Sequence, residues 1–398
     1  MRTQNQNFEL PTPPEADLRK VEPLLDFIAT EMANNGGRLS FERFMEIALY
    51  TPALGYYTSA NNIFGGEGDF ITAPELTPLF SRCIARQICQ AMAEIDSAIS
   101  VLEFGAGAGT MAIDILKELQ VLDSLPSNYY IVEISPLLQQ RQREKITEQL
   151  PHLLDRVSWV KEVPDEFVGI IVGNEILDAI PPQRIRFNPD GNHQELYVEL
   201  KDNRFCWVAG EITDSRLLEH CQRIFENYRE NFIVPYETEV NLEAMDWIAG
   251  IAHKLKQGVI LLIDYGYEEK EFYRPERHKG TLMCHYKHLA HENALIHVGL
   301  QDITSHVNFT QIAEAAFGNG LSVLGFTNQT YFLISCGLES LLTNIDINNT
   351  KQFLKETQPV KQLILPDEMG ELFKVIAFGK NFSQPLLGFS MNNQLERL

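Results

Sequence analysis

Long hydrophobic runs and paired cysteines are both missing from this chain of 398 residues. No apolar stretch reaches the roughly eighteen residues that a membrane-spanning helix needs. The six cysteines form no Cys-x-x-Cys pair, which argues against a zinc knuckle and against a disulfide framework. Residues 1–9 lack both the apolar core of a signal peptide and the arginine richness of an organelle presequence. We therefore expect a soluble, cytoplasmic protein with reduced thiols and no membrane insertion.

Basic residues are also scarce. The chain has 33 lysines and arginines against 54 aspartates and glutamates, which gives a formal net charge of -21. Because lysine and arginine carry most of the affinity for nucleic acid, this balance argues against a nucleic-acid partner. Acidic surfaces attract basic partners, although solubility alone explains the charge equally well. The sequence leaves the oligomeric state open.

The sequence also lacks the spacing of histidines, cysteines and acids that is typical of a metal site. His285, His288 and His291 recur at every third residue, and on a helix this spacing would keep them within about 120° of one another. No carboxylate or cysteine is tied to them, and an exposed polar face explains them equally well. We therefore expect no metal site.

The most informative segment that is present is a glycine turn between an apolar strand and a helix. Gly105, Gly107 and Gly109 permit positive φ and a close approach of backbone N–H groups to a ligand. A dinucleotide fingerprint would have a third glycine where Thr110 stands. The pattern Glu103-x-Gly105-x-Gly107-x-Gly109 instead resembles the first motif of class I S-adenosylmethionine-dependent methyltransferases. An acid at Glu103 suits a cationic ligand.

A second strand–helix unit follows the glycine turn. Residues 129–133 are aromatic and β-branched, end in Glu133, and lead through Ser135 and Pro136 into a helix. A carboxylate at this strand tip is placed to accept hydrogen bonds from both ribose hydroxyls of a nucleoside. A solvated acid at the strand end is the alternative, and the register with the glycine turn favours the ribose role.

The remaining pattern predicts a doubly wound α/β protein. Further strands are expected at 157–160, 168–175, 259–264, 321–326 and 373–378, with helices at 24–32, 41–49, 242–255 and from 309. An inserted β-meander is expected at 183–187, 195–200 and 204–208. The expected organisation is an N-terminal helical and lid region (1–97), a first core part (98–182), the β-meander with its helices (183–257) and a second core part (258–398).

A glycine-rich stretch at residues 65–75 precedes the core. So many glycines beside Pro74 indicate an ordered loop that covers a ligand, and a structural turn explains them equally well. On the first interpretation, Thr72 and Glu75 at its end lie beside the cofactor.

Five segments carry a more specific resemblance: Gly55-Tyr56-Tyr57-Thr58, residues 69–75, residues 174–181, residues 263–266 and residues 301–309. Together with residues 369–375 they resemble the MidA family of methyltransferases, whose mitochondrial members assist complex I assembly. The resemblance runs from about residue 24 to residue 380. It departs mildly at Leu300, where a polar residue is expected.

The resemblance implies S-adenosylmethionine as cofactor, S-adenosylhomocysteine as product, and a seven-stranded Rossmann-like sheet. In the mitochondrial branch it implies symmetric dimethylation of an arginine in a core subunit of complex I. The expected partner is therefore a basic, arginine-containing protein. The residues expected at the cofactor are Glu103, Gly105, Gly107, Gly109, Glu133, Asn174, Thr72 and Glu75.

Acidic residues after the fourth core strand are the expected catalytic groups. A guanidinium is always protonated, so carboxylates must position it and receive its proton. Glu175 is the expected clamp and Asp178 lies three residues on, although both acids also suit a helix N-terminus. Asp302 and His306 are expected to line the acceptor pocket, with His306 as a proton acceptor or a buried structural histidine.

Two other functions stay open at this point. One is methyl transfer to a small molecule, and the other is a cofactor-binding assembly chaperone that has lost turnover. DNA amino-methylation is disfavoured because the Asn/Asp-Pro-Pro-aromatic motif is absent and the charge has the wrong sign.

Overall fold

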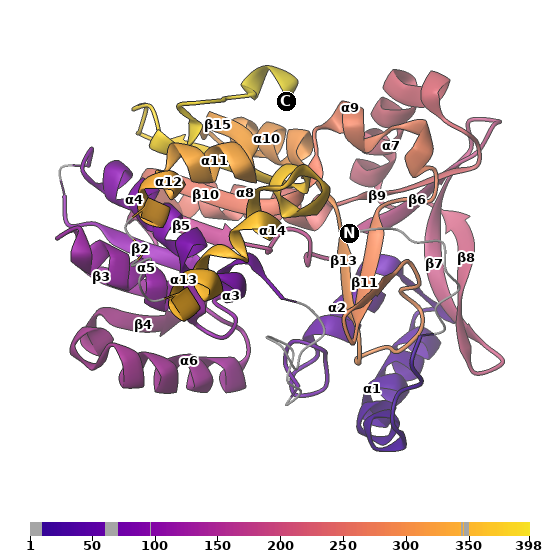
Figure 1. The fold of residues 1–398 in the computed structure, drawn as a ribbon. Coiled ribbons are helices and arrows are strands. Elements are labelled where there is room, and N and C mark those ends of the chain that lie inside the picture. Colours follow the sequence, from indigo (N-terminus) through magenta and orange to yellow (C-terminus); the bar gives the residue numbers. More distant parts are fainter. Residues whose placement is uncertain (1–9, 60–70, 96, 344, 346–349) are drawn as a thin grey trace.

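A large mixed sheet forms the centre of the protein in the computed structural model, which describes residues 10–59, 71–95, 97–343, 345 and 350–398 (Figure 1). Seven strands lie in the order β15 (Ser322–Asn328), β16 (Phe373–Lys380), β10 (Leu255–Tyr267), β5 (Phe167–Asn174), β2 (Ser100–Phe104), β3 (Asn128–Val132) and β4 (Val157–Val160). The strands from β10 to β4 are parallel, whereas β16 is antiparallel to both neighbours. The short β14 (Val307–Asn308) pairs with the end of β10.

Helices cover both faces of this sheet, because successive residues of each buried strand point to opposite faces. Val101 packs into the hydrophobic cluster of one face, while Leu102 packs into that of the other. The first face is covered by α4 (Pro78–Met92), α5 (Thr110–Val121), α6 (Pro136–Gln149) and α11 (Gln329–Ser335). The second face is covered by α8 (Leu242–Lys254) and α10 (Phe309–Gly318). The predicted doubly wound α/β architecture is therefore confirmed.

A second sheet lies beside the first. Its strands are β1 (Arg38–Ser40), β7 (His193–Lys201), β6 (Gln183–Phe187) and β9 (Tyr236–Val240), and β8 (Arg204–Glu211) pairs with β7. The segments expected to form a meander lie in β6, β7 and β8, which pair antiparallel in this order, and β1 and β9 widen the sheet. Because β1 pairs with β7, the N-terminal helices α1 (Glu15–Asn34) and α2 (Phe41–Tyr50) belong to the same unit as the insertion. Helix α7 (Ser215–Tyr228) packs on its other part.

A small third sheet comes from the later part of the chain, with the strands β12 (Leu289–His291), β11 (Leu282–Tyr286) and β13 (Asp302–Ser305). His285 and His291 therefore lie on the strands of a hairpin and His288 lies in its turn, so these three residues share no helix face. Within the described ranges, no group of three or more histidines, cysteines or acids could hold a metal ion.

The remaining helices are short and connect these parts. They are α3 (Ala73–Leu76), α9 (Glu269–Phe272), α12 (Leu338–Thr343), α13 (Thr350–Thr357) and α14 (Val360–Ile364). None of the helices that the structure describes is both long and apolar enough to cross a membrane.

Candidate active site

A cavity of about 1420 Å³ lies at the carboxyl ends of β2, β3, β5 and β10. This edge of an open parallel sheet is where ligands bind in doubly wound folds. One side of the cavity is formed by the glycine turn and the tip of β3. The other side is formed by the end of α2, the hairpin β11–β12 and the start of β13, so the cavity joins the core to the N-terminal unit.

The glycine turn adopts the left-handed backbone that its sequence predicts. Gly105, Gly107 and Gly109 have φ of 59°, 52° and 78°. Gly109 directly precedes α5, so the N-terminal end of that helix is directed at the cavity. A Cβ on Gly105 would lie 2.5 Å from the Cδ1 atom of Ile176, so the loop after β5 packs closely on this glycine and the isoleucine side chain would have to move to admit a larger residue.

Glu103 is the penultimate residue of β2 and is fully buried in the cavity wall. The Tyr129 hydroxyl donates to its Oε2 at 2.5 Å, whereas Oε1 has no hydrogen-bond partner among the described residues. Burial raises the pKa of Glu103 to about 8. A buried carboxylate oxygen that lacks a donor suits a cationic or hydrogen-bonding group in the cavity.

Glu133 lies at the tip of β3, as predicted, and is already fixed by the protein. Its Oε1 accepts from the Ser135 amide at 2.9 Å and its Oε2 accepts from Gln142 Nε2 at 3.1 Å. Gln142 Nε2 also donates to the Gly107 carbonyl at 2.9 Å, and Trp159 Nε1 donates to Gln142 Oε1 at 2.8 Å. Gln142 thus connects Glu133 to the glycine turn. The sequence contains no local signal for this role.

Thr72 and Glu75 lie at and just inside the start of α3, and both line the cavity. Glu75 accepts a hydrogen bond from the Thr110 hydroxyl, and Lys145 Nζ donates to Thr110 Oγ1 at 2.7 Å. The segment after the predicted cover loop is therefore tied to the first turn of α5. Most of that loop, residues 65–70, lies outside the described residues.

The backbone after β5 turns sharply at Glu175, which has φ of 54°. Asp264, at the corresponding point of β10, holds this turn. Its Oδ2 accepts from the amides of Ile176, Leu177 and Asp178 at 3.1, 2.8 and 3.3 Å. The Glu175 amide donates to the Ile263 carbonyl at 2.9 Å. A non-glycine residue in this strained conformation is typical of a functional position.

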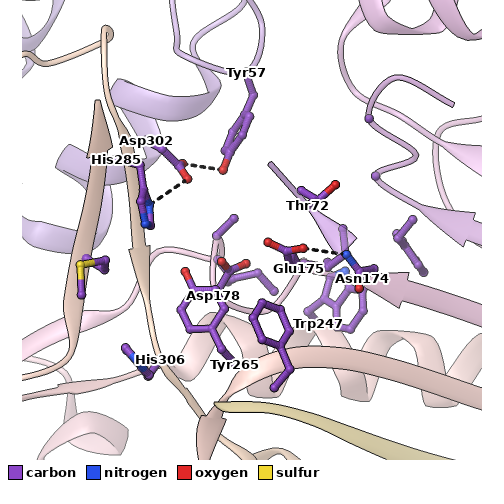
Figure 2. Close-up of a pocket in the computed structure, with 18 of the residues that line it drawn as sticks. Tyr57, Thr72, Asn174, Glu175, Asp178, Trp247, Tyr265, His285, Asp302 and His306 are labelled. Carbon is purple, nitrogen blue, oxygen red and sulfur yellow. Dashed lines mark hydrogen bonds and ion pairs between the residues drawn. The ribbon is translucent and has the colours of Figure 1, made fainter. Parts of the chain in front are cut away.

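Asn174, Glu175 and Asp178 project from this turn into the cavity (Figure 2). Asn174 Nδ2 donates to Glu175 Oε1 at 2.9 Å. Burial, and then the charge of Asp178, raises the pKa of Glu175 to about 8. Burial raises the pKa of Asp178 to about 6, and the Asp178 side chain lies beside the Tyr265 ring in Figure 2. Asn174 Oδ1 and Asp178 Oδ1 are buried without a hydrogen-bond partner in the described structure.

Asp302 faces the same cavity from the start of β13 (Figure 2). The Tyr57 hydroxyl donates to its Oδ1 at 2.6 Å, and His285 Nδ1 lies 3.9 Å from its Oδ2. Tyr57 in turn stacks on Tyr50, with ring centroids 5.5 Å apart. The two tyrosines come from the N-terminal unit, so this unit forms the wall of the cavity around Asp302.

His306 lines the cavity as predicted, but its environment disfavours a charged ring. Its Nδ1 lies 3.0 Å from the Thr281 carbonyl, and its ring stacks on Tyr267 with centroids 5.3 Å apart. Burial lowers the pKa of His306 to about 4. A ring that remains neutral at pH 7 is a weak final proton acceptor, and this favours the carboxylates for that role.

Sequence reasoning missed several residues of the site. Asp264 was visible as the acid that ends a predicted strand, but its contacts with a turn that follows another strand were not. Tyr50, Trp247 and Tyr265 also line the cavity, and Trp247 packs edge-on against Phe104 with centroids 4.9 Å apart. These positions have no motif of their own, because distant segments bring them together.

Comparison with known proteins decides the family. Residues 83–327 match the model of a family of S-adenosyl-L-methionine-dependent methyltransferases. The chain belongs to this family. A structure of a COG1565 superfamily member from Burkholderia thailandensis, bound to S-adenosyl-homocysteine, is 37% identical. The alignment covers 98% of this chain and 100% of that one, with a TM-score of 0.93.

Curated relatives are more distant. The zebrafish (Danio rerio) protein arginine methyltransferase NDUFAF7, mitochondrial, is 27% identical over 371 residues, which cover 85% of this chain and 82% of the relative. The human (Homo sapiens) protein of the same name is 27% identical over 391 residues, which cover 90% and 83%. The resemblance inferred from the sequence motifs is thereby confirmed.

S-adenosylmethionine is accordingly the cofactor of this methyltransferase, and the residues of the cavity fit it. The unpartnered Oε1 of Glu103 and the glycine turn at the N-terminal end of α5 form one end of the cavity, and Glu133 lies beside them. The roles predicted for Glu103, Glu133, Asn174, Thr72 and Glu75 stay predictions at the level of individual contacts.

Proposed function

We propose that this methyltransferase is a protein arginine N-methyltransferase. The observation that carries the proposal is the convergence of Glu175, Asp178 and Asp302 on the cavity, next to the turn that packs on the glycine loop. Three carboxylates around one space form a site for a cation with several N–H donors. A guanidinium has five such donors in a planar arrangement.

The charge of the site supports a cationic acceptor. The charges of Asp178 and Asp302 help to raise the pKa of Glu175, and that of Glu175 affects the buried Asp264 in the same way. A bound guanidinium would remove this repulsion and lower these pKa values. The acceptor is therefore favoured in its charged form, and the carboxylates become ionised as it binds.

The chemistry follows from the same residues. When bound, S-adenosylmethionine supplies the methyl group from its sulfonium. Glu175 holds the guanidinium so that one terminal nitrogen faces this group, and orientation of this kind can lower a barrier by roughly 7–11 kcal/mol. One nitrogen–carbon bond would form as the methyl carbon–sulfur bond breaks, with S-adenosylhomocysteine as the leaving group, and the nitrogen would lose one proton, which Glu175 accepts. Burial raises the pKa of Glu175 to about 8 in the ligand-free site, and the bound cation lowers it, so that the carboxylate is ionised and able to accept the proton near neutral pH.

The acceptor is proposed to be a basic, arginine-containing protein. The names of the zebrafish and human relatives, protein arginine methyltransferases, support arginine as the target. The family resemblance extends the proposal to symmetric dimethylation and to a subunit of complex I. The cavity of about 1420 Å³ has room for the cofactor and for an arginine side chain.

The test uses methyl-labelled S-adenosylmethionine and a lysate of the host. Wild-type protein is compared with Glu175→Gln and with the control Glu148→Gln, which changes an exposed side chain on α6. After hydrolysis of the labelled proteins, we expect label in dimethylarginine with the wild type and the control. With Glu175→Gln we expect a loss of about a thousandfold, while binding of S-adenosylhomocysteine by calorimetry is unchanged.

Other outcomes would contradict the proposal. Label in a small molecule alone would move the function to a small-molecule methyltransferase. Cofactor binding without any labelled product would favour an assembly chaperone. Retained turnover in Glu175→Gln would exclude the carboxylate clamp.

A further inference from the structure

A second cavity adjoins the active-site cavity. It has a volume of about 460 Å³, and we call it the side pocket. Tyr267, residues 277–280 and His306 line both cavities. Further lining residues of the side pocket lie on β6, β9 and β11, so it is bounded by the core sheet and by the second sheet. Because the two cavities share a wall, a polypeptide that places an arginine in the first can extend into the second.

The shared wall is held in place by hydrogen bonds to the second sheet. The His278 carbonyl accepts from an amide of β9 at 2.9 Å, and the Lys279 carbonyl accepts from an arginine of β6 at 2.9 Å. The Thr281 amide donates to Glu239 Oε2 at 2.7 Å. The backbone on both sides of Lys279 is therefore fixed by the fold, and so is the place from which its side chain starts.

Two cations on this wall have no acidic partner. Lys279 is exposed, and its side chain forms no ion pair or hydrogen bond with the residues that the structure describes. The guanidinium of Arg277 lies on the Tyr267 ring, 3.7 Å from the centroid. In the described part of the chain, only one of its five N–H groups has an acceptor, the Glu271 carbonyl. Both cations are therefore able to bind an anion that enters the side pocket.

A buried arginine adds to this positive charge. Arg184 is 7% exposed, and its Nε is buried without a hydrogen-bond partner among the described residues. Its Nη2 donates to Glu237 Oε2 at 3.1 Å, while Arg186 Nη2 donates to Glu237 Oε1 at 2.6 Å. The carboxylate of Glu237 is thus already paired with two arginines. The other acid that lines the side pocket, Glu292, is exposed.

The two adjoining cavities therefore carry charges of opposite sign. Carboxylates of Glu175, Asp178 and Asp302 surround the first, whereas Arg277 and Lys279 line the second. A ligand that is complementary to both has a cation and an anion a short distance apart. In a polypeptide these groups are an arginine and a nearby aspartate or glutamate. An extended chain advances roughly 3.3–3.6 Å per residue, so a few residues are enough to connect them.

We propose that the side pocket binds the carboxylate of an aspartate or glutamate that lies close in sequence to the methylated arginine. Arg277 and Lys279 hold this carboxylate, and the charge of Arg184 stabilises it from the buried side. The inference rests on the proposed arginine methylation and adds a rule for the choice among arginines. The acceptor can be basic as a whole, but a lysine or arginine at this one position would be repelled by the cations of the pocket.

The test uses synthetic peptides that each contain one arginine and one glutamate. The glutamate is moved through the first five positions on either side of the arginine, and each peptide is matched by one with glutamine in its place. At the best position, we expect kcat/KM of the wild type to be about five- to tenfold higher with glutamate than with glutamine. Lys279→Glu should invert this ratio, and a peptide with lysine at the same position should then be the better substrate.

Two further variants serve as comparison and control. Arg277→Gln removes the second cation and should lower the glutamate-to-glutamine ratio severalfold. Lys201→Glu changes an exposed lysine that lines neither cavity, and we expect it to leave the ratio unchanged. Improved turnover of the lysine peptide by Lys279→Glu cannot result from a damaged fold. The preference of the wild type should also weaken as the salt concentration rises.

The outcomes separate this inference from the proposed function. Methylation of all arginine peptides with the same kcat/KM would overturn the role of the side pocket and leave arginine methylation intact. An equal glutamate-to-glutamine ratio in the wild type and in Lys279→Glu would do the same. If no arginine peptide is methylated while S-adenosylhomocysteine still binds, the proposed function and this inference are both wrong.

Discussion

The two sides of the active-site cavity are built in different ways. On the cofactor side, two consecutive strand–helix units supply the residues. Glu103 lies near the end of β2, the three glycines form the turn that follows it, and Glu133 directly follows β3. On the acceptor side, the Tyr57 hydroxyl donates a hydrogen bond to Asp302, which lies 245 residues later in the sequence. A local motif can therefore identify the cofactor, whereas the acceptor depends on contacts between distant segments.

One residue connects the two sides. Asp264 accepts three amide hydrogen bonds from the turn that carries Glu175 and Asp178. The same turn packs on Gly105 through Ile176. A substitution on the cofactor side can therefore be compared with one on the acceptor side while the hydrogen bonds of Asp264 remain in place.

The largest expected effect on the cofactor side comes from Gly107→Val. Valine at φ of 52° is strained, and its side chain fills the turn where a ligand approaches the backbone. We expect the affinity for S-adenosylhomocysteine to fall about hundredfold, measured by calorimetry. Gly318→Ala is the control, because a Cβ there has no atom within 4 Å. An unchanged affinity in Gly107→Val would contradict the placement of the cofactor.

Substitution of Asp264, which connects the two sides of the cavity, should reduce both stability and turnover. Asp264→Asn replaces an acceptor oxygen with a donor that faces backbone amides. We expect the free energy of unfolding to fall by about 1–3 kcal/mol, measured by urea denaturation, together with a loss of turnover. Asp155→Asn, at an exposed position, is the control. Full activity in a destabilised Asp264→Asn protein would show that the turn does not need this anchor.

Tyr57→Phe should weaken turnover of the acceptor without changing cofactor binding. The ring and its stacking on Tyr50 remain, but the hydrogen bond to Asp302 is lost. We expect kcat/KM for the acceptor to fall about tenfold and the affinity for S-adenosylhomocysteine to stay the same. Tyr50→Phe is the matched control, because the Tyr50 hydroxyl donates to the Ala179 carbonyl and not to a carboxylate. Equal losses in both variants would remove the special role of Tyr57.

The smallest expected effect is a pH dependence of stability. The pKa values of Glu103 and Glu175 are raised from 4.5 to about 8 in the folded protein. As pH rises above 4.5, the unfolded chain releases these protons while the folded protein keeps them, so stability falls until about pH 8. Glu175→Gln should therefore raise the Tm of the ligand-free protein by about 2 °C near pH 8 and by much less near pH 5. The same gain at both pH values would contradict the raised pKa of Glu175.

Much of the core could be predicted from the sequence. The strands that carry Glu103, Asn174 and Asp264, and the strand that directly precedes Glu133, were all located, because buried parallel strands are continuous apolar runs with polar residues near their ends. The insertion was only partly predicted. β1 has three residues and belongs to a sheet whose other strands come more than 140 residues later, so its local pattern carries no signal.

The sequence by itself determined the cofactor class, because the glycine spacing and the strand-tip acids lie within one short segment whose geometry is set by local backbone conformation. It also named Glu175, Asp178, Asp302 and His306. Only the tertiary structure decided their environment: burial among like charges raises the pKa of Glu175, and burial between tyrosines lowers that of His306. Desolvation depends on every element that packs around a group, and no local pattern in the sequence contains that information.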